Sequence, residues 1–543
     1  MPLTPTTRRT VLRKLIGSGL QVSPDALDYI LSLDSPLIAV ETIIAECASS
    51  TYPSVLSLEY IKGQVSEDGS GIHEAVTQEF VSKEASEALE YARINQAETN
   101  SWIIELIKSP LEDLVGSQGT VEDFLRLFRD RFRRIRSIYM GRIDTQGAFS
   151  PAAAKSFSRD TRRFRAMGRE GKRGLKPPSQ KVIGIVREKS VSKSGNVIVE
   201  IEDEDGVLNA VIPARKEGLK GHELAEKASS ILLDEIVCLS GFVDEDGRMI
   251  ADDVIFPDIP TARHAGRAER DVYATFVSDL HVGSNEFLED EFDHFIDWLR
   301  GHDVDGPDKA MVEKIRYLFI AGDLVDGIGV YPEQFADLVI PSLYDQYSKL
   351  AEKLRKLPER IKIICIPGNH DASRQALPKP PIHKEFAKSL YDLGSKVLMV
   401  GDPTHIRVEG VDILLTHGDS LDDMVTSIPG ASYKDPALPM KALLRKRHLA
   451  PIYGGKTELA PLGRDWMVID SVPDIVHFGH AHHNAKDAYR GVMIINSGTF
   501  QSQTEFMRKQ GVVPTPGIVT IINLRTGADE LKLFYDFSQR API

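Results

Sequence analysis

The sequence predicts a multidomain protein with a helical N-terminal domain, a small β barrel and a C-terminal α/β layered domain. Three observations carry this prediction. Apolar residues first recur at helical spacing, short β segments separated by turn residues follow, and β runs then alternate with helices. A length of 543 residues allows two to four domains of about 100–200 residues each. We expect the boundaries 1–115, 116–180, 181–262 and 263–543.

Composition is typical of a soluble globular protein, with 42% hydrophobic and 27% charged residues. No apolar run approaches the roughly 18–20 residues that cross a bilayer, so we expect no membrane partner and a cytoplasmic location. The three cysteines, Cys47, Cys238 and Cys365, lie in apolar segments without paired spacing. This favours core positions over a disulfide framework or a thiolate zinc site.

The first 180 residues predict a helical domain, one further helix and a linker. Helical spacing runs from about residue 7 to residue 114, with Ser23-Pro24 and Ser35-Pro36 as expected helix starts. Residues 121–139 then predict a helix with arginines on its polar face. Residues 144–180 are rich in Ser, Ala, Gly, Pro and Arg without periodicity, which is typical of a flexible linker. The apolar stripe expected on the 121–139 helix consists of Phe124, Leu125, Phe128, Phe132 and Ile135.

The net charge of -13 hides a strongly basic stretch. Residues 126–176 contain sixteen Lys and Arg against four acids, a local charge of +12. Such a stretch favours non-specific, salt-dependent affinity for DNA through counterion release, with Phe157 and Phe164 as stacking groups. The alternative is a well-solvated linker without a partner.

Residues 181–262 predict a small barrel of five strands and one helix. We expect the helix at 223–230, between the third and fourth strands. This order matches a Greek-key barrel of OB type and is shared by other small β barrels. The acidic loop 202–205 argues against a free nucleic-acid surface there and favours contact with protein. The expected strands are 182–186, 196–201, 207–212, 236–241 and 249–251.

In the α/β layered domain, five strands end in short clusters rich in Asp, Asn and His. Catalytic residues of such domains usually lie on loops at strand ends. The expected strands are 273–277, 316–320, 361–366, 411–416, 475–478 and 492–496. The clusters are Asp279-Leu280-His281, Gly322-Asp323-Leu324-Val325-Asp326-Gly327, Gly368-Asn369-His370-Asp371, His417-Gly418-Asp419 and Gly479-His480-Ala481-His482.

These residue types suit a metal site. Carboxylate, amide and imidazole donors bind Mn²⁺, Fe²⁺ or Zn²⁺ without any thiolate. Glycine stands beside a ligand in the second to fifth clusters (Gly322, Gly368, Gly418 and Gly479), which allows sharp turns and close approach of the backbone. One such cluster alone is often an ordinary surface turn. Five in chain order, each after a β run, predict a binuclear metal site.

The five clusters resemble the calcineurin-like metallophosphoesterases, whose signature is D-x-H, GD-x-x, GNH-[DE], a lone H and GH-x-H. The resemblance implies a four-layer αββα domain holding two divalent metal ions, with Mn²⁺ as the first candidate and Mg²⁺, Fe²⁺ or Zn²⁺ as others. A shared water, activated between the two cations, would attack the phosphate. By position, the implied ligands are Asp279, His281, Asp323 and His482 at one metal and Asp323, Asn369, His417 and His480 at the other.

The same resemblance implies a role for the histidine of the third cluster. His370 would contact the scissile phosphate and protonate or stabilise the leaving oxygen, oriented by Asp371 or Asp326. The second cluster lacks the Asp followed by Arg-Gly that is typical of protein phosphatases. This argues against a phosphoprotein phosphatase and leaves the role of Asp326 open.

Residues around the ligands resemble the small subunits of archaeal family D DNA polymerases, on stretches 278–284, 368–381 and 447–455. The likeness extends from about residue 181 to the C-terminus. It implies a 3′→5′ proofreading exonuclease acting on single-stranded or mismatched DNA 3′ ends, with a large catalytic polymerase subunit as partner. A sliding clamp is a further candidate partner.

Two alternatives to this exonuclease hypothesis are open. One is a catalytically vestigial scaffold subunit, as in the related eukaryotic B-subunits that have lost metal ligands. The present sequence retains every ligand, which favours an active enzyme. The other is a stand-alone phosphodiesterase, which would have little need for the helical, basic and barrel segments.

Four basic residues are candidate DNA contacts. Arg374 follows the third cluster and is expected to clamp a phosphate, the alternative being a salt bridge within its loop. Lys441, Arg445 and Lys446 lie in the insert between the fourth and fifth clusters. We expect them to reach DNA phosphates, the alternative being a solvated helix face.

Overall fold

The computed structural model describes residues 102–111, 116–158, 161–162, 179–214, 218–302, 304 and 306–539, together with 11, 24–32, 39–40 and 43. The chain divides into two compact units, Met1–Gln96 and Ala97–Ile543. In the first unit, helix α2 (Pro24–Ser32) begins at a predicted helix start. Apart from residues 11, 39–40, 43 and 102–111, the rest of the predicted N-terminal helical domain lies outside the described residues, as do Cys47 and residues 159–160 and 163–176 of the basic stretch.

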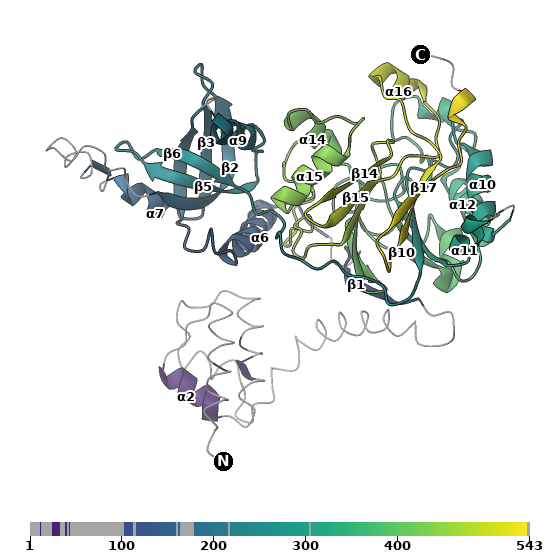
Figure 1. The fold of residues 1–543 in the computed structure, drawn as a ribbon, viewed down its shortest axis with the longest axis horizontal. Helices are drawn as coiled ribbons and strands as arrows, with labels where there is room; N and C mark the ends of the chain where they lie inside the picture. The colour runs from purple at the N-terminus through teal and green to yellow at the C-terminus, as the bar shows by residue number, and fades with distance from the viewer. Residues whose placement is uncertain are drawn as a thin grey trace. The chain divides into compact units, whose positions relative to one another are not determined.

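The second unit contains an α/β domain built on two six-stranded sheets (Figure 1). Four neighbouring strands of the first sheet run parallel, as do three neighbouring strands of the second, so their carboxyl ends meet at one edge of each sheet. The first sheet has the order β10 (Val397–Met399), β9 (Lys362–Ile366), β8 (Ile315–Ala321), β7 (Tyr273–Val277), β16 (Ile518–Asn523) and β17 (Asp529–Leu533). The second has the order β1 (Ile104–Lys108), β11 (Thr404–Val408), β12 (Val411–Leu415), β13 (Ile475–Phe478), β15 (Val492–Asn496) and β14 (Ala485–Tyr489).

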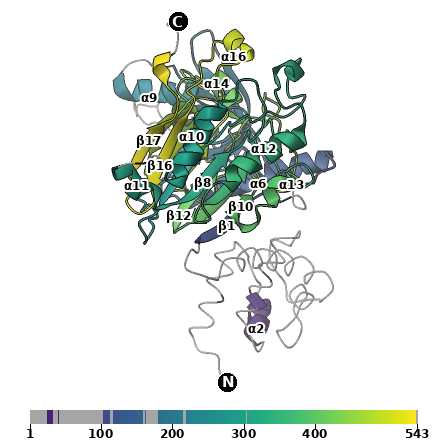
Figure 2. The same ribbon diagram turned by 90° about the vertical axis from the view of Figure 1, so that its right-hand side faces the viewer.

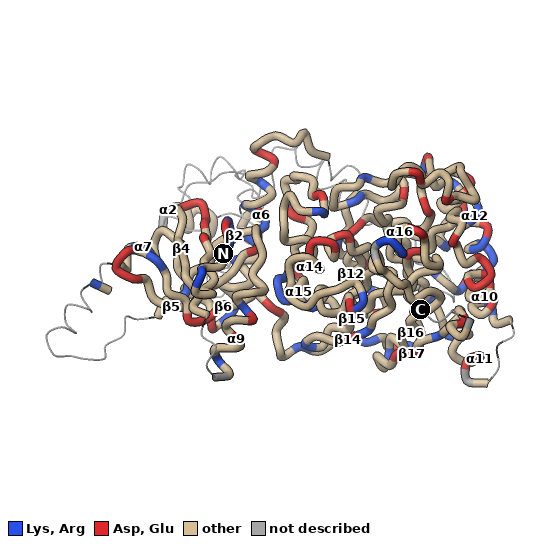
Figure 3. The backbone as a smooth tube through the Cα atoms, turned by 90° about the horizontal axis from the view of Figure 1, so that it is seen from above, with Lys and Arg blue, Asp and Glu red and all other residues tan. Residues whose placement is uncertain are grey.

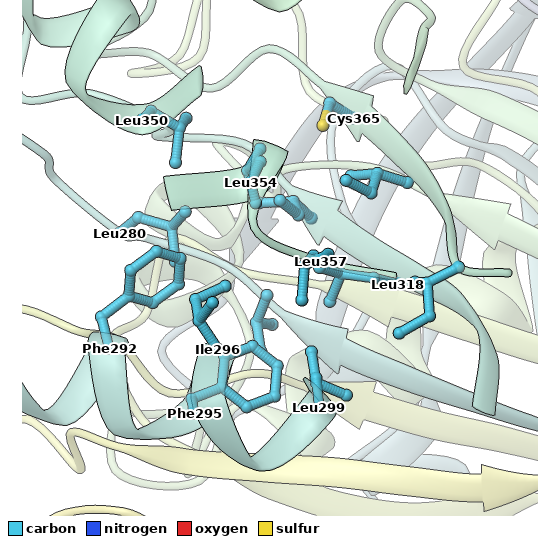
Figure 4. Close-up of a cluster of buried hydrophobic side chains, with 14 of the residues drawn as sticks. Leu280, Phe292, Phe295, Ile296, Leu299, Leu318, Leu350, Leu354, Leu357 and Cys365 are labelled. Atoms are coloured by element: carbon cyan, nitrogen blue, oxygen red, sulfur yellow. The ribbon is translucent and has the colours of Figure 1, made fainter. Parts of the chain in front are cut away.

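Helices cover the outer face of each sheet, which gives the four-layer αββα order implied by the sequence. Phe276 and Phe319 of the first sheet pack with Ile413 of the second in one buried cluster between the sheets. Helices α10 (Glu289–Arg300), α11 (Pro307–Val312) and α12 (Leu343–Arg355) cover the first sheet (Figure 2). In this outer core, Phe292 and Phe295 lie with Leu318 of β8 (Figure 4). Helices α14 (Leu421–Ser427) and α15 (Ala437–Lys446) cover the second sheet; α13 (Lys388–Tyr391) and α16 (Glu505–Gln510) are short.

Residues 180–255 form a closed five-stranded barrel with a helix between its third and fourth strands, as expected. The strands pair in the order β2–β3–β4–β6–β5, and β2 pairs with β5 to close the ring. Closure leaves no unpaired edge within the barrel. Its elements are β2 (Gln180–Val191), β3 (Val197–Asp203), β4 (Gly206–Ile212), α9 (Gly218–Ser229), β5 (Ile236–Val243) and β6 (Met249–Ile255).

Part of the predicted flexible linker is ordered, which corrects that prediction for its first half. Helix α7 (Pro151–Ser156) buries Ala154 in the barrel core. The backbone N–H of Phe149 donates to the carbonyl of Lys181 at 2.8 Å. The reason is local: Ser150 caps the helix, Pro151 begins it, and its alanines are small enough to lie against the barrel.

The predicted boundary at residue 115 is also wrong, because β1 belongs to the second unit. β1 pairs antiparallel with β11 at the edge of the second sheet. Trp102, Ile104 and Leu106 alternate toward the apolar cluster between the sheets. This alternation of apolar residues, which is typical of a strand, is short and lies within a longer stretch of helical spacing.

Helix α6 (Val121–Met140) confirms the predicted helix and, except at Leu125, its predicted apolar stripe. A capping box between Thr120 and Asp123 fixes its start. Leu125, expected on the apolar face, is 45% exposed. Arg131, which the sequence did not single out, is fully buried.

Arg131 joins three parts of the second unit. Its Nε donates to Asp465 Oδ2 at 2.6 Å. Its NH1 donates to the carbonyls of Pro451 at 2.7 Å and of Asp234 in the barrel at 3.1 Å. Planar guanidinium geometry suits such a buried, multiply bonded position, and the arginine links α6 to both the barrel and the α/β domain.

Two cysteines confirm the prediction of core positions. Cys238 and Cys365 are free and buried. Burial raises the pKa of the Cys238 thiol to about 12. No helix of the described residues is long and apolar enough to span a bilayer.

Candidate metal centre

The five strand-end clusters converge at the carboxyl edges of the two sheets. Asp279 and His281 follow β7, Asp323 follows β8, and Asn369 and His370 follow β9. The second sheet supplies His417 after β12, and His480 and His482 after β13.

One group of four donors matches the implied first metal position. The ligand atoms of Asp279, His281, Asp323 and His482 all lie within 4.8 Å of one another. His281 Nε2 lies 3.1 Å from His482 Nε2, and His482 Nε2 lies 3.3 Å from Asp279 Oδ1. Asp323 Oδ2 lies 3.6 Å from His281 Nε2.

A second group matches the other implied position. Asn369 Oδ1 lies 2.9 Å from His417 Nε2 and 3.1 Å from His480 Nδ1. His417 Nε2 is also 3.3 Å from Asp323 Oδ2, so Asp323 lies in both groups. Asp419, which the sequence did not single out as a ligand, forms a further donor cluster with His417 and His480.

The donor set fits divalent cations. It offers oxygen and imidazole nitrogen only, which borderline and hard divalent ions accept. In the first group, the Nε2 atoms of His281 and His482 lie 3.1 Å apart, beside the carboxylates of Asp279 and Asp323. One cation bound between these atoms would satisfy the lone pairs that converge there. The seven predicted ligands are therefore brought together as the sequence implied, and which ions they hold is a matter for proposal.

Backbone conformation at the site is strained. Asp279, His281, Asp323, His480 and His482 all have φ between 49° and 65°. For residues with a Cβ this left-handed conformation costs about 1–2 kcal/mol each. Strained backbone conformations cluster at functional sites. Here they direct the side chains of these residues toward the centre of the site.

Two of the glycines beside the ligands are required by close approach. A Cβ at Gly368 would lie 2.1 Å from Asp323 Oδ1, and one at Gly479 would lie 2.5 Å from Asp279 Oδ2. This confirms the prediction that the glycines let the backbone approach the ligands.

The carboxylates and imidazoles perturb one another strongly. Burial alone would raise the pKa of Asp323, but His417, His370 and His281 hold this pKa well below its usual range. Burial alone would lower the pKa of His417, but Asp323 and other acids raise it to about 10. Since a metal ligand must be deprotonated, cation binding at His417 is expected to release a proton.

Three of the predicted ligand histidines are oriented through their other ring nitrogen. His281 Nδ1 lies 3.0 Å from Asp326 Oδ1, and His417 Nδ1 lies 2.8 Å from the carbonyl of Ala321. His480 Nε2 lies 3.0 Å from Asp422 Oδ1. Such contacts fix the ring and its tautomer, which leaves the remaining nitrogen aimed at the centre. Sequence reasoning missed Asp422; its only signal was its position five residues after His417.

His370 is half-buried beside the site, and its orientation corrects one prediction. Its Nδ1 lies 2.8 Å from the backbone carbonyl of Asp326, so Asp326 orients it through the main chain. The Asp371 carboxylate instead accepts from the backbone N–H groups of Gly368 at 2.9 Å and Leu324 at 3.1 Å. Asp371 therefore holds two strand-end loops together rather than orienting His370.

Of the predicted DNA contacts on α15, the one at Lys446 is wrong, and those at Lys441 and Arg445 stay predictions. Lys446 is buried, and its Nζ donates to Glu235 Oε2 of the barrel at 2.5 Å. Arg445 lies over the Phe256 ring at 4.4 Å, and Lys441 pairs with Asp487. Their charges are used in contacts with the barrel or within the domain, which fits the prediction that the barrel contacts protein.

Arg374 bonds to its own loop. Its Nε donates to the carbonyl of Ala376 at 3.0 Å, and its NH2 group donates to the carbonyl of Pro378. It also lines a cavity of about 550 Å³ together with Tyr453 and Thr457. A phosphate contact by Arg374 stays a prediction.

The layered fold and its cluster of Asp, Asn and His donors define a calcineurin-like metallophosphoesterase domain. Residues 274–486 match the family model for the B-subunit of DNA polymerase alpha/epsilon. The DNA polymerase II small subunit of Archaeoglobus fulgidus is 35% identical over 537 residues, covering 97% of this chain and 98% of that protein. The chain therefore belongs to the family of archaeal DNA polymerase II small subunits, which confirms the resemblance seen in the sequence.

Some other relatives are longer than this chain. The DNA polymerase II small subunit of Pyrococcus furiosus is 38% identical over 414 residues, covering 76% of this chain and 64% of that protein. Among solved structures, an archaeal phosphodiesterase is similar over 48% of this chain and 99% of its own, at 12% identity and a TM-score of 0.26.

Proposed function

We propose that this chain is the metal-dependent 3′→5′ DNA exonuclease subunit of an archaeal replicative DNA polymerase. The observation that carries the proposal is the convergence of all seven predicted ligands in two groups that share Asp323, with His370 bonded to Asp323. An intact donor set of this kind favours an active enzyme over a vestigial scaffold. The relatives' designation as small subunits of DNA polymerase II favours DNA over other phosphodiesters.

The proposed chemistry divides between bound cations and the chain's own residues. Two divalent cations, Mn²⁺ first among the candidates, would supply a nucleophile near neutral pH and neutralise phosphate oxygens. Asp279, His281 and His482 would hold one cation, and Asn369, His417 and His480 the other, with Asp323 shared.

His370 would act on the leaving group. Its Nδ1 faces the Asp326 carbonyl, which directs Nε2 away from that carbonyl. When the ring is protonated, Nε2–H is free to donate to the leaving oxygen of the phosphodiester. Asp326 thus serves two histidines, His281 through its carboxylate and His370 through its carbonyl.

The proposed partners follow from the family. A small subunit implies a large catalytic subunit, and proofreading implies single-stranded or mismatched DNA 3′ ends as substrate. A sliding clamp stays a prediction on which no described residue bears.

The test uses the purified chain, 3′-labelled single-stranded DNA and Mn²⁺, with and without a chelator. We expect release of labelled nucleoside monophosphate that the chelator abolishes. The variants Asn369→Ala, His417→Ala and His370→Ala should lose this activity, while Asn209→Ala, on the exposed face of β4, should keep it. Wild-type rates in Asn369→Ala and His417→Ala would favour the scaffold alternative, and a wild-type rate in His370→Ala alone would refute the role given to His370.

A further inference from the structure

Two aromatic rings continue outward from the catalytic histidine. Tyr331 lies in the loop after the second cluster, with its ring centroid 6.3 Å from that of His370. Phe506 of α16 stacks on Tyr331, with centroids 6.1 Å apart and planes inclined by 24°. His370, Tyr331 and Phe506 thus form a row that starts at the proposed site of phosphate cleavage.

The outer ring of this row is open to solvent. Phe506 is 57% exposed, although a large apolar side chain gains by burial. One face of the Phe506 ring is occupied by Tyr331. The exposed part of the ring is therefore available to a further flat partner.

The segment that carries the inner ring is bonded to Asp326 of the second cluster. The Tyr331 hydroxyl donates to Asp337 Oδ2 at 3.0 Å. Gln334, in the same loop, accepts from the backbone N–H of Val330 at 2.9 Å and donates to the carbonyl of Asp326 at 2.7 Å. Since that carbonyl also bonds His370, the aromatic row and the catalytic histidine share one support.

The helix that carries Phe506 is also basic in its last turn, at Arg508 and Lys509 (Figure 3). Lys509 is 3.9 Å from Glu505, a long, exposed ion pair that is worth little. Proteins bind single-stranded nucleic acid with exposed aromatic rings and neighbouring cations, because the bases stack on the rings and the cations attract the phosphates.

We propose that Phe506 and Tyr331 form a stacking platform for unpaired bases at the 3′ end of the DNA strand being cut. The inference rests on the proposed exonuclease function and names its substrate-selecting surface. Stacked bases follow at about 3.4 Å along a strand, so the row is within reach of the last few nucleotides. A base in an intact duplex is already paired and stacked, so the platform selects frayed, mismatched or single-stranded ends.

Binding rather than cleavage tests the platform directly. The probe is a fluorescent single-stranded oligonucleotide, compared with the same strand carrying abasic nucleotides at its 3′ end, with chelator present. We expect wild type to bind the normal strand about ten-fold to a hundred-fold more tightly than the abasic one. Phe506→Ala should lose this difference, and Phe506→Tyr should keep it. Leu533→Ala, a control at an equally exposed (57%) apolar residue of β17, should behave as wild type.

A second measurement distinguishes a protein-docking role. If Phe506→Ala keeps the full preference for the normal strand, or loses only its binding to a purified large subunit, the platform proposal is overturned. Loss of the base preference with unchanged Mn²⁺ affinity by calorimetry supports it. Because binding is measured without metal, absence of Mn²⁺-dependent cleavage in wild type would refute the exonuclease function separately.

Discussion

A single methyl group at residue 368 is expected to disrupt the metal centre. In Gly368→Ala, the new Cβ would lie 2.1 Å from Asp323 Oδ1 and 2.4 Å from the Asp323 backbone nitrogen, where ordinary contact begins at 3.4 Å. Relief therefore requires a displacement of about 1 Å or more between the two loops, which lie in a closely packed interior. Asp323 Oδ1 also accepts from the backbone N–H of His370 at 2.8 Å, so these two residues move together.

The magnitude follows from that displacement. A misplacement of 1 Å costs about 10²-fold in rate, so kcat/KM for 3′-end cleavage should fall at least about 100-fold, or ~2.7 kcal/mol. Mn²⁺ affinity, measured by calorimetry, should fall about 10–100-fold. Gly463→Ala is the matched control, because nothing lies within 4 Å of a Cβ there. Unchanged Mn²⁺ affinity and rate in Gly368→Ala would refute the placement of Asp323 at the centre of the site.

Three further predictions concern orientation, the buried ion pair and pH. Asp422→Ala removes the acceptor of His480 Nε2 and should lower the affinity for Mn²⁺, measured by calorimetry, about 10–100-fold. Asp422→Asn should recover part of this affinity. An unchanged affinity in Asp422→Ala would contradict the orienting role of Asp422. Arg131→Leu leaves the buried Asp465 carboxylate without this cation and should lower the free energy of unfolding by about 3–5 kcal/mol in denaturant titrations. The exposed Arg129→Leu should cost less than about 1 kcal/mol, and equal losses would count against the buried link. Burial lowers the pKa of His477 to about 3, so stability from this group is present above pH 6.5 and is lost as the unfolded chain takes up the proton below it. Between pH 7.5 and 5, wild type should lose ~2 kcal/mol more unfolding free energy than His477→Gln, and parallel pH profiles would show that His477 is not buried neutral.

The site could be predicted from the sequence because each ligand is fixed locally. Asp279, Asp323 and Asn369 come directly after strands of one sheet, and parallel strands bring their carboxyl ends to one edge. The glycines next to the ligands signal the close approach that the structure contains at Gly368 and Gly479. The local pattern thus predicted where the centre lies, and the family resemblance implied which residues form each group.

Partners far apart in the sequence could not be predicted in this way. In the sequence, nothing distinguishes Lys446 from a solvated lysine, because its partner Glu235 lies 211 residues away. Arg131 shares a helix with many exposed arginines, and only Asp465 and the surrounding carbonyls make its burial favourable. Strand β1 needs β11 as its partner, about 300 residues further on, and five residues alone carry too weak a pattern.

The most direct test of the central claim is a calorimetric titration of Mn²⁺ into the chelator-treated chain, read together with 3′-end cleavage. We expect two bound ions per chain, loss of one in Asn369→Ala, loss of both in Asp323→Ala, and cleavage only when both are bound. A chain that binds no Mn²⁺, or that cuts DNA equally well after Asp323→Ala, would contradict the account.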